Sequence, residues 1–451
     1  MTPALCLRMI TDLAPQLESG EISARELTDA CLERIARRNP DLNAFIAVDE
    51  DGARAVASRT DDEIAAGRYR GPLHGIPISV KDLIDVKGLP TTAASKIRPK
   101  TPAARDAPIV ANLRAAGAIV LGKCNLHEFA FGTTGEDSAF GPTRNPHDTS
   151  RSPGGSSGGS AVAVATGMSY GSVGTDTGGS IRIPSAACGT VGLKPGFGEL
   201  PCDGVIPLSR SLDHVGPLAR SVVDAWLLYQ AMGGQEPRIP PETNPRGALR
   251  LGVPRRYFLD HIDPNVRGRF NDALGLLSDA GVTTTDVDVP HASEIASVYL
   301  HIVLPEAMTY HSRTLDSRPE EYTPGVRLRL EMGRYVLAED YLRAQRGREV
   351  LRREITAAMT NCAALVLPTL AIPPPPFGVE SIAVGGLNDS VRSVTLRLTQ
   401  AFNLTGHPAI SVPCGNTPDD LPCGLQLVGH INQTIELLTV ARRVETTIRP
   451  V

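Results

Sequence analysis

Two turns rich in glycine and serine carry the residue types from which a nucleophilic site can be built. Residues 154–160 read Gly-Gly-Ser-Ser-Gly-Gly-Ser, and residues 176–180 read Asp-Thr-Gly-Gly-Ser. Upstream, Lys81 stands at the end of an apolar run. A serine hydroxyl becomes a useful nucleophile when a neighbouring base takes its proton, and a neutral lysine amine can be that base. The combination indicates acyl transfer at a serine, with lysine in the role that histidine often fills.

The second turn also offers backbone donors. Glycine allows positive φ angles and close approach of the backbone to a ligand. The N–H groups of Thr177, Gly178, Gly179 and Ser180 can then converge on the oxyanion that forms when a carbonyl is attacked. Removing one such donor typically costs about 3–4 kcal/mol of transition-state stabilisation. We therefore expect an oxyanion hole at these residues.

Lys81 can accept a proton only when its amine is neutral, and the usual pKa of lysine is about 10.4. Burial disfavours the ammonium form and lowers that pKa. The neighbouring carboxylate of Asp82 would oppose this shift, but strand alternation sends Asp82 to the opposite face. The sequence thus predicts a buried strand over residues 75–82 with Lys81 at its tip. The alternative for Lys81 alone is a surface lysine that closes a strand.

Two other interpretations of the first turn remain open. A Gly/Ser-rich stretch is typical of flexible linkers, although apolar helical sequence follows here at residues 161–165. A phosphate-binding loop would end in Gly-Lys-Ser or Gly-Lys-Thr, whereas residues 159–161 read Gly-Ser-Ala. We favour the nucleophilic turn over both.

The elements that must position these turns alternate between helical patterns and short apolar runs. Such alternation favours an α/β domain with a largely parallel or mixed sheet. Predicted helices begin at Ser23, where Ser-Ala-Arg-Glu is a capping box, and end at Asn39-Pro40; others cover residues 53–66, 106–117, 161–165 and most of 290–360. Besides 75–82, predicted strands cover residues 119–122, 172–175, 249–253, 365–368, 409–413 and 424–429. Residues 232–246 read as a surface connection.

Composition narrows the class of protein. The chain has 451 residues, of which 41% are hydrophobic, and a net charge of −4. A sizeable core is expected, and the absence of a long basic run argues against a nucleic-acid partner. No apolar run reaches the length of about 18 residues that a membrane span needs. Residues 1–8 lack the features of a signal peptide.

The eight cysteines form no C-x-x-C pair and no Cys/His cluster of the kind that binds zinc. In a chain of this length they read as free thiols in a reducing compartment. We therefore expect a cytoplasmic protein without a bound metal.

Several motifs, in order and at compatible spacing, resemble the amidase signature family. They are GIPISVKD (75–82), TTA (91–93), PGGSSGGS (153–160), GTDTGGSIRIP (174–184), CG (188–189), GLKP (192–195), GVIP (204–207), SLDHVGP (211–217) and PAISVP (408–413). The resemblance covers nearly the whole chain except residues 235–360. It implies one large α/β domain, with a central twisted mixed sheet covered by helices on both faces. It divides the chain into a helical region (1–66), the signature core (67–235), a variable region that sets specificity (236–362) and a segment that completes the core (363–451).

The family uses a Ser–cis-Ser–Lys triad. Carried over by position, Ser180 is the nucleophile, Ser156 is the bridging serine after a cis peptide bond, and Lys81 is the base. No metal or organic cofactor is implied. The resemblance also implies substrate contacts, which we assign to Phe131, Gly132, Thr133, Gly155 and Ile206.

Three residues near these motifs receive structural interpretations. Asp176 and Arg182 flank the second turn and are expected to form a structural ion pair. Cys188 is expected in the core and not as a second nucleophile. His127 is not expected to act as a general base, because Lys81 already has that role.

The resemblance implies a stand-alone amidase that hydrolyses a small or medium amide, with esters, anilides and carbamates (urethanes) as related substrates and a homodimer as a compatible assembly. An alternative is the glutaminase component of a tRNA-dependent amidotransferase, which needs two further partner proteins and tRNA. Such glutaminases usually carry Asn-x-x-Arg-Tyr-Asp-Gly-Val-Arg, whereas residues 305–311 read PEAMTYH and residues 325–327 read GVR. A second alternative is a binding or scaffold protein that kept the fold without activity. Residues 196–199 read GFGE where many relatives have TYGR, which puts ordinary substrate choice in doubt.

Overall fold

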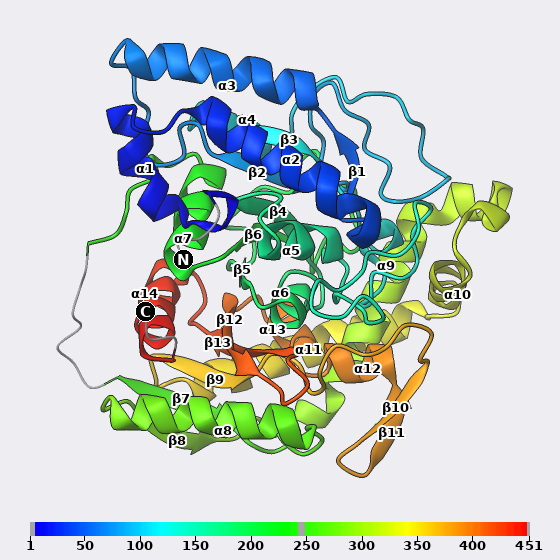
Figure 1. Cartoon of the computed structure of the whole chain (residues 1–451). Coiled ribbons are helices and arrows are strands. Elements are labelled where there is room, and N and C mark those ends of the chain that lie inside the picture. The colour runs from blue at the N-terminus through cyan, green and yellow to red at the C-terminus, as the bar shows by residue number, and fades with distance from the viewer. Residues whose placement is uncertain (1–4, 242–248, 449–451) are drawn as a thin grey trace.

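The computed structural model of the chain describes residues 5–241 and 249–448 (Figure 1). Eleven strands form one mixed sheet in the order β1-β3-β2-β4-β6-β5-β12-β13-β9-β7-β8. Every strand predicted from the sequence lies in this sheet. The strands are β1 (Phe45–Val48), β2 (Pro77–Lys81), β3 (Ile119–Cys124), β4 (Gly171–Asp176), β5 (Val191–Lys194), β6 (His214–Ala219), β7 (Arg250–Pro254), β8 (Thr283–Val287), β9 (Ala364–Pro368), β12 (Ala409–Asn416) and β13 (Pro422–Val428); β10 (Ser381–Val384) and β11 (Leu387–Ser390) form a separate hairpin.

Strand β2 lies between β3 and β4 and runs parallel to both. Because the carboxyl ends of parallel strands meet at the same edge of a sheet, the end of β2 at Lys81 lies beside the end of β4 at Thr175 and Asp176. The register pairs Val80 with Val173. Two turns that are far apart in the sequence are thus brought to one edge.

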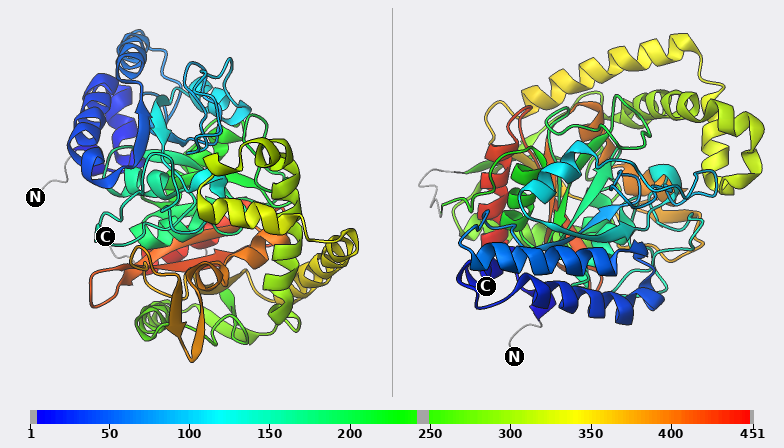
Figure 2. Two further views of the ribbon diagram at one scale, coloured as in Figure 1. Left: turned by 90° about the vertical axis from the view of Figure 1, so that its right-hand side faces the viewer. Right: turned by 90° about the horizontal axis from the view of Figure 1, so that it is seen from above.

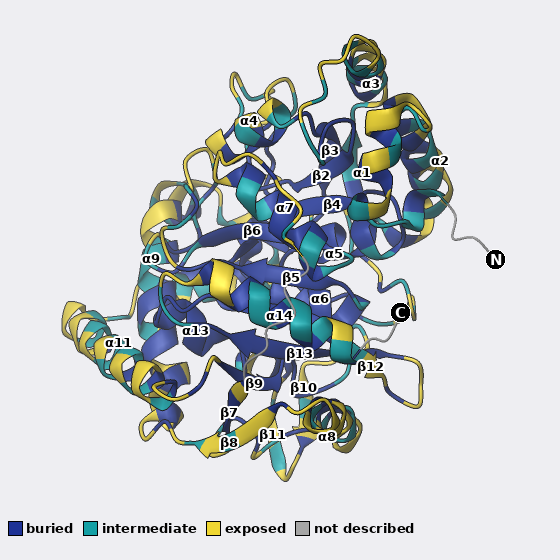
Figure 3. Cartoon of the chain, turned by 90° about the vertical axis from the view of Figure 1, so that its left-hand side faces the viewer, coloured by how far each residue is buried: buried dark blue, intermediate teal, exposed yellow. Residues whose placement is uncertain are grey.

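Helices cover both faces of the sheet, as the family resemblance implied. The helices α5 and α6 lie on one face, and α7 and α14 lie on the other (Figure 1). The strands, α5 and α6 are largely buried, whereas α3, α8 and α11 expose one side (Figure 3). The α-helices are α1 (Ile10–Ser19), α2 (Ala24–Leu42), α3 (Glu50–Ala65), α4 (Pro108–Ala115), α5 (Gly158–Ala165), α6 (Arg182–Cys188), α7 (Val222–Met232), α8 (Pro264–Asp279), α9 (Ile295–Ser317), α10 (Pro324–Gly333), α11 (Ala338–Ala358), α12 (Val391–Leu396), α13 (Gln400–Leu404) and α14 (Thr434–Ile448); short 3₁₀ turns are η1 (Leu5–Leu7), η2 (Glu128–Ala130), η3 (Ala292–Glu294) and η4 (Pro319–Glu321).

The expected end of the first long helix was wrong. Ser23 begins α2 with the predicted capping box, but the helix continues through Pro40 to Leu42. A proline near the end of a helix removes only one N–H donor, so the last turn can survive it. Asn43 then ends the helix in the left-handed conformation (φ 51°), and its N–H donates to the carbonyl of Asn39 at 2.8 Å.

The region 290–360 is helical, as predicted, and consists mainly of α9, α10 and α11. These helices form an arm along one side of the molecule (Figure 2). All four segments of the sequence-based division contribute strands to the single sheet, and the division itself stays a prediction. The predicted surface connection at 232–246 extends into residues 242–248, which lie outside the described chain. Among the described residues, no helix combines the length and apolar character that a membrane crossing requires.

Candidate functional site

The two glycine/serine turns are joined directly by hydrogen bonds. The N–H of Ser157 donates to the carbonyl of Ser180 at 3.1 Å, and the Ser157 hydroxyl donates to the carbonyl of Thr175 at 3.1 Å. The peptide bond between Gly155 and Ser156 is cis. The first turn leads into α5 and the second into α6, so both helices fix the turns against the sheet.

Lys81 is fully buried, and its amine donates to the hydroxyls of Ser156 at 2.8 Å and Thr175 at 2.7 Å. Burial lowers the pKa of Lys81 to about 7, and the negative charges of Asp176 and Asp213 oppose that shift only partly. The neighbouring Asp82 faces away from the site, where it pairs with Lys123 at 2.8 Å, as strand alternation predicted. Lys81 can therefore exchange a proton with Ser156 near neutral pH.

Ser180 lies at the start of the turn that leads into α6 and is 6% exposed. Its hydroxyl makes no hydrogen bond with any group of the described chain, including the hydroxyl of Ser156. The structure thus brings Lys81 to Ser156, and it brings Ser180 to the backbone of the adjacent Ser157. It leaves the Ser180 oxygen without a protein partner.

Four backbone donors of the second turn are also unpaired. The N–H groups of Thr177, Gly178, Gly179 and Ser180 donate to no acceptor within the described residues. The carbonyl of Gly178 points the other way and accepts from the hydroxyl of Thr399 at 2.6 Å. Free N–H groups beside a serine hydroxyl are the arrangement that can stabilise a developing oxyanion.

Glycine is required at positions 178 and 179 by close packing. A Cβ atom on Gly178 would lie 2.5 Å from the hydroxyl of Tyr299, and one on Gly179 would lie 2.3 Å from that of Thr399. Gly179 also has a φ of +144°, which other residues rarely adopt. The turn therefore keeps its shape only with glycine at both positions.

Two carboxylates hold the second turn in place. Asp213 accepts from the Thr177 hydroxyl at 2.6 Å and from two N–H groups of the loop 208–209. Burial raises the pKa of Asp213 to about 6. Asp176 forms a fully buried, bidentate ion pair with Arg182 at 2.9 and 3.0 Å, and the Arg182 guanidinium holds the pKa of Asp176 below its usual range. The structural ion pair expected between Asp176 and Arg182 is present.

The five residues assigned to substrate contacts lie on both sides of the turns. Phe131 and Thr133 are buried, and the Thr133 hydroxyl accepts from Thr395 at 2.9 Å. Gly155 is pressed against the segment 133–135, since a Cβ there would lie 3.0 Å from that backbone. Gly132 packs against the His127 ring, and Ile206 is buried next to the loop that begins at Pro207.

The larger surface hollows do not include the buried serine and lysine groups. None of five hollows in the described chain is lined by Lys81, Ser156 or Ser180. One of about 320 Å³ is walled by the loop 207–211, which Asp213 ties to Thr177, and by Glu306 and Tyr341.

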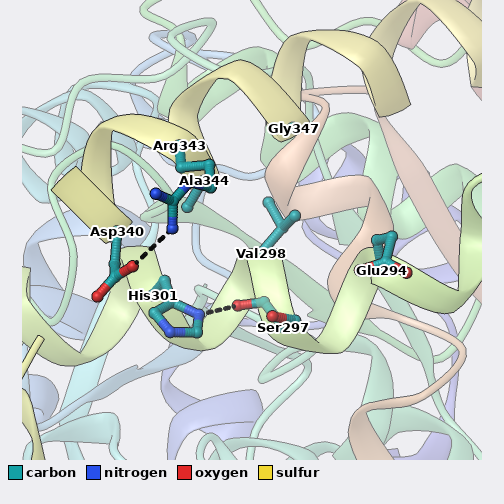
Figure 4. A pocket seen from close by; sticks show the side chains of 8 residues that line it. All are labelled: Glu294, Ser297, Val298, His301, Asp340, Arg343, Ala344 and Gly347. Carbon is teal, nitrogen blue, oxygen red and sulfur yellow. Dashed lines mark hydrogen bonds and ion pairs between the residues drawn. The ribbon is translucent and has the colours of Figure 1, made fainter.

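The hollow in Figure 4, about 300 Å³, lies between α9 and α11. Its polar groups already have partners, because Arg343 donates to Asp340 at 3.0 Å and the His301 ring bonds to the Ser297 carbonyl at 2.8 Å. We therefore assign it no role in the chemistry.

Other expectations can be compared with the structure. Cys188 is buried in the core, burial raises the pKa of its thiol, and all eight cysteines are free. His127 points its ring to Asp137 at 3.2 Å, and burial lowers the pKa of His127. Sequence reasoning missed Thr175 and Asp213, although both lie inside motifs that it singled out. The parallel pairing of their strands was the missing information.

Comparison with known proteins agrees with this architecture. The sequence profile described as Amidase matches residues 26–438. An amidase from Pseudomonas putida is 43% identical over 427 residues, covering 91% of this chain and 90% of that protein. The glutaminase-type component of a glutamyl-tRNA(Gln) amidotransferase from Acidothermus cellulolyticus is 38% identical over 488 residues, covering 99% of this chain and 95% of that protein.

A solved structure described as a crystal structure of amidase superposes with a TM-score of 0.92 at 38% identity, covering 98% of this chain and all of that one. Profile, sequence identity and superposition each extend over nearly the whole chain. On this evidence the chain belongs to the amidase signature family.

Proposed function

We propose that this chain is a serine amidase that cleaves the carbonyl C–N bond of a small or medium amide through an acyl-enzyme. Membership of the amidase family makes it a hydrolase of C–N bonds, and the residues that carry the reaction are our proposal. The single observation that supports it most is the 2.8 Å hydrogen bond from the buried Lys81 amine to the Ser156 hydroxyl.

In the proposed reaction, Ser180 Oγ attacks the substrate carbonyl carbon. Its proton passes to Ser156, whose own proton passes to neutral Lys81. The N–H groups of residues 177–180 stabilise the oxyanion, and their lack of protein acceptors supports this role. The protonated lysine returns the proton through Ser156 to the departing amine, and the C–N bond breaks. Water then hydrolyses the ester to Ser180 by the reverse path.

The same chemistry extends to esters, anilides and carbamates, because each presents a carbonyl with a departing heteroatom. A panel of p-nitroanilides, aryl amides, aliphatic amides and carbamates would rank these classes. We expect amides to be hydrolysed with the highest kcat/KM.

A fluorophosphonate probe tests the nucleophile. We expect covalent labelling of the wild type at Ser180 and none of Ser180→Ala, which should also lose turnover by about 10⁴-fold or more. Ser185→Ala is a matched control, because Ser185 is a buried hydroxyl without a hydrogen-bond partner one turn further along; it should label normally. A wild type that neither labels nor hydrolyses any amide would support the binding or scaffold alternative.

The second candidate is the glutaminase component of a tRNA-dependent amidotransferase, which the curated relatives from such amidotransferases favour. The expected glutamine-associated stretch is absent from residues 305–311. Ammonia release from glutamine that rises when a purified partner complex is added would favour this candidate. Hydrolysis of amides by the isolated chain would favour the stand-alone enzyme.

A further inference from the structure

Phe131, one of the residues assigned to the substrate pocket, lies between two guanidinium groups. The Arg329 guanidinium is 5.4 Å from the centre of its ring, and that of Arg392 is 5.5 Å away. Two cations share one buried ring, and neither is used by the proposed reaction. Bringing like charges together is unfavourable unless an anion is present at least part of the time.

The two arginines differ in how their charge is balanced. Arg329 lies 3.7 Å from the carboxylate of Asp137. Arg392, which is partly buried, forms no ion pair with any carboxylate of the described chain. Its hydrogen-bond partner is the hydroxyl of Tyr299, which is neutral because burial raises the pKa of Tyr299 to about 12.

The nearest acidic residue on the same segment does not supply the missing charge. Asp389 borders the same hollow as Arg392, but it is not within ion-pair distance, and it accepts from the N–H of Ser390 at 2.6 Å. The positive charge of Arg392 is therefore uncompensated. Burial lowers the pKa of Arg392 without bringing arginine near neutrality at physiological pH.

This charge borders the proposed reaction centre through two sets of contacts. Tyr299, the partner of Arg392, packs its hydroxyl against Gly178 of the oxyanion turn. The helix α12, which carries Arg392, places Leu396 against the same glycine and Thr395 against Thr133. The segment that begins at Phe131 then abuts Gly155, just before Ser156. Arg392 thus lies on the elements that surround both turns.

We propose that this site takes amides that also carry a carboxylate, and that Arg392 binds that carboxylate, with Arg329 adding positive potential across the Phe131 ring. The proposal rests on the proposed amidase function and names its substrate class. A guanidinium presents two parallel N–H donors that match the two oxygens of a carboxylate. A neutral amide would leave the charge of Arg392 unbalanced and would bind less well.

The test uses pairs of substrates that differ in one charge. For a carboxylate on the acyl side, the pairs are succinamate against succinamide and glutaramate against glutaramide. For a carboxylate on the amine side, the pair is an N-acylglycine against its methyl ester, with amide cleavage measured. We expect kcat/KM to be about 10- to 100-fold higher for the charged member of at least one pair, the range of a charge-assisted hydrogen bond. Equal values in all pairs would overturn the proposal.

Variants assign that preference to one residue. Arg392→Gln should lower the preference to less than about threefold while changing the rate on neutral amides little, and Arg392→Lys should restore part of it. Arg397→Met is the matched control, since Arg397 borders the same hollow but its guanidinium is occupied by the Tyr257 carbonyl at 2.7 Å and by the Tyr257 ring at 3.9 Å. It should keep the wild-type preference. A preference that persists in Arg392→Gln would overturn the assignment.

Inhibition by succinate distinguishes a substrate subsite from a separate anion site. We expect competitive inhibition that weakens at least fivefold in Arg392→Gln. Non-competitive inhibition would mean that the anion binds elsewhere and would overturn the proposal. Failure of the amidase function itself looks different: no amide, charged or neutral, would be hydrolysed, and Ser180 would not be labelled.

Discussion

Lys81 and Asp82 are adjacent in the sequence, but they belong to two buried regions with opposite designs. On one face, Lys81 contacts only hydroxyls, those of Ser156 and Thr175. On the other face, Asp82 forms an ion pair with Lys123 at 2.8 Å, and Lys123 also donates to the Pro90 carbonyl at 3.0 Å. Both lysines are fully buried.

The difference shows what makes a buried amine useful as a base. Burial lowers the pKa of both lysines, but at Lys123 the contact with Asp82 opposes the shift. Burial alone is not sufficient, because Lys194 is equally buried and donates only to the carbonyls of Pro195 and His407. Lys81 combines a lowered pKa with a hydroxyl that can pass a proton on.

The largest effect should come from Lys81→Met. We expect kcat/KM to fall about 10³-fold or more, because the proton acceptor is lost. Stability should not fall, since below pH 10.4 the unfolded chain binds a proton more readily than the buried amine does, which costs the wild type stability that rises again with pH. Steady-state kinetics and thermal unfolding of the same preparation measure both. A variant with near-normal kcat/KM would remove Lys81 from the mechanism.

Lys123→Met should give the opposite pattern. Leaving Asp82 buried without its partner should lower the free energy of unfolding by about 3–5 kcal/mol, whereas kcat per folded molecule should change less than about threefold. Denaturant unfolding and active-site titration separate the two quantities. The double variant Lys123→Met/Asp82→Leu is the control and should recover much of the stability. A tenfold loss of kcat without loss of stability would break the contrast between the two faces.

The pH dependence should report Lys81 directly. Activity needs the neutral amine, so kcat/KM should rise about tenfold per pH unit below the pKa and level off above it, with a midpoint near the Lys81 value of about 7. A profile of kcat/KM from pH 5 to 9 measures it on a substrate without an ionisable group. A profile that is flat across this range, with chemistry limiting the rate, would contradict the assignment.

The smallest effect is expected at Asp213. Its negative charge raises the pKa of Lys81, so Asp213→Asn should move the acidic limb to lower pH by less than about one unit. The rate at the plateau should also fall, because Thr177 loses a charged hydrogen-bond acceptor. Thr177→Val is the matched control: it removes the same hydrogen bond but keeps the charge, so the limb should stay in place. A shift to higher pH in Asp213→Asn would refute the electrostatic argument.

Much of the fold followed from local patterns because those patterns report local physics. The apolar runs that became β2, β4, β9 and β12 are short, rich in β-branched residues and bounded by glycine or proline. The end of α2 was misplaced because proline opposes a helix only where its missing N–H and its ring meet the preceding turn. The capping residue Asn43 decided the boundary instead.

By itself, the sequence determined the chemistry that this protein has available: a lysine at a strand end, two glycine turns with serines, and motifs that resemble one family of hydrolases. Only the tertiary structure decided which groups meet. Parallel pairing of β2 with β4 brings Thr175 to Lys81, and α12 carries Arg392 to the ring of Phe131, 261 residues away from it in numbering. Sequence patterns act over a few residues, whereas pKa values and charge balance depend on whatever lies within a few ångströms after folding.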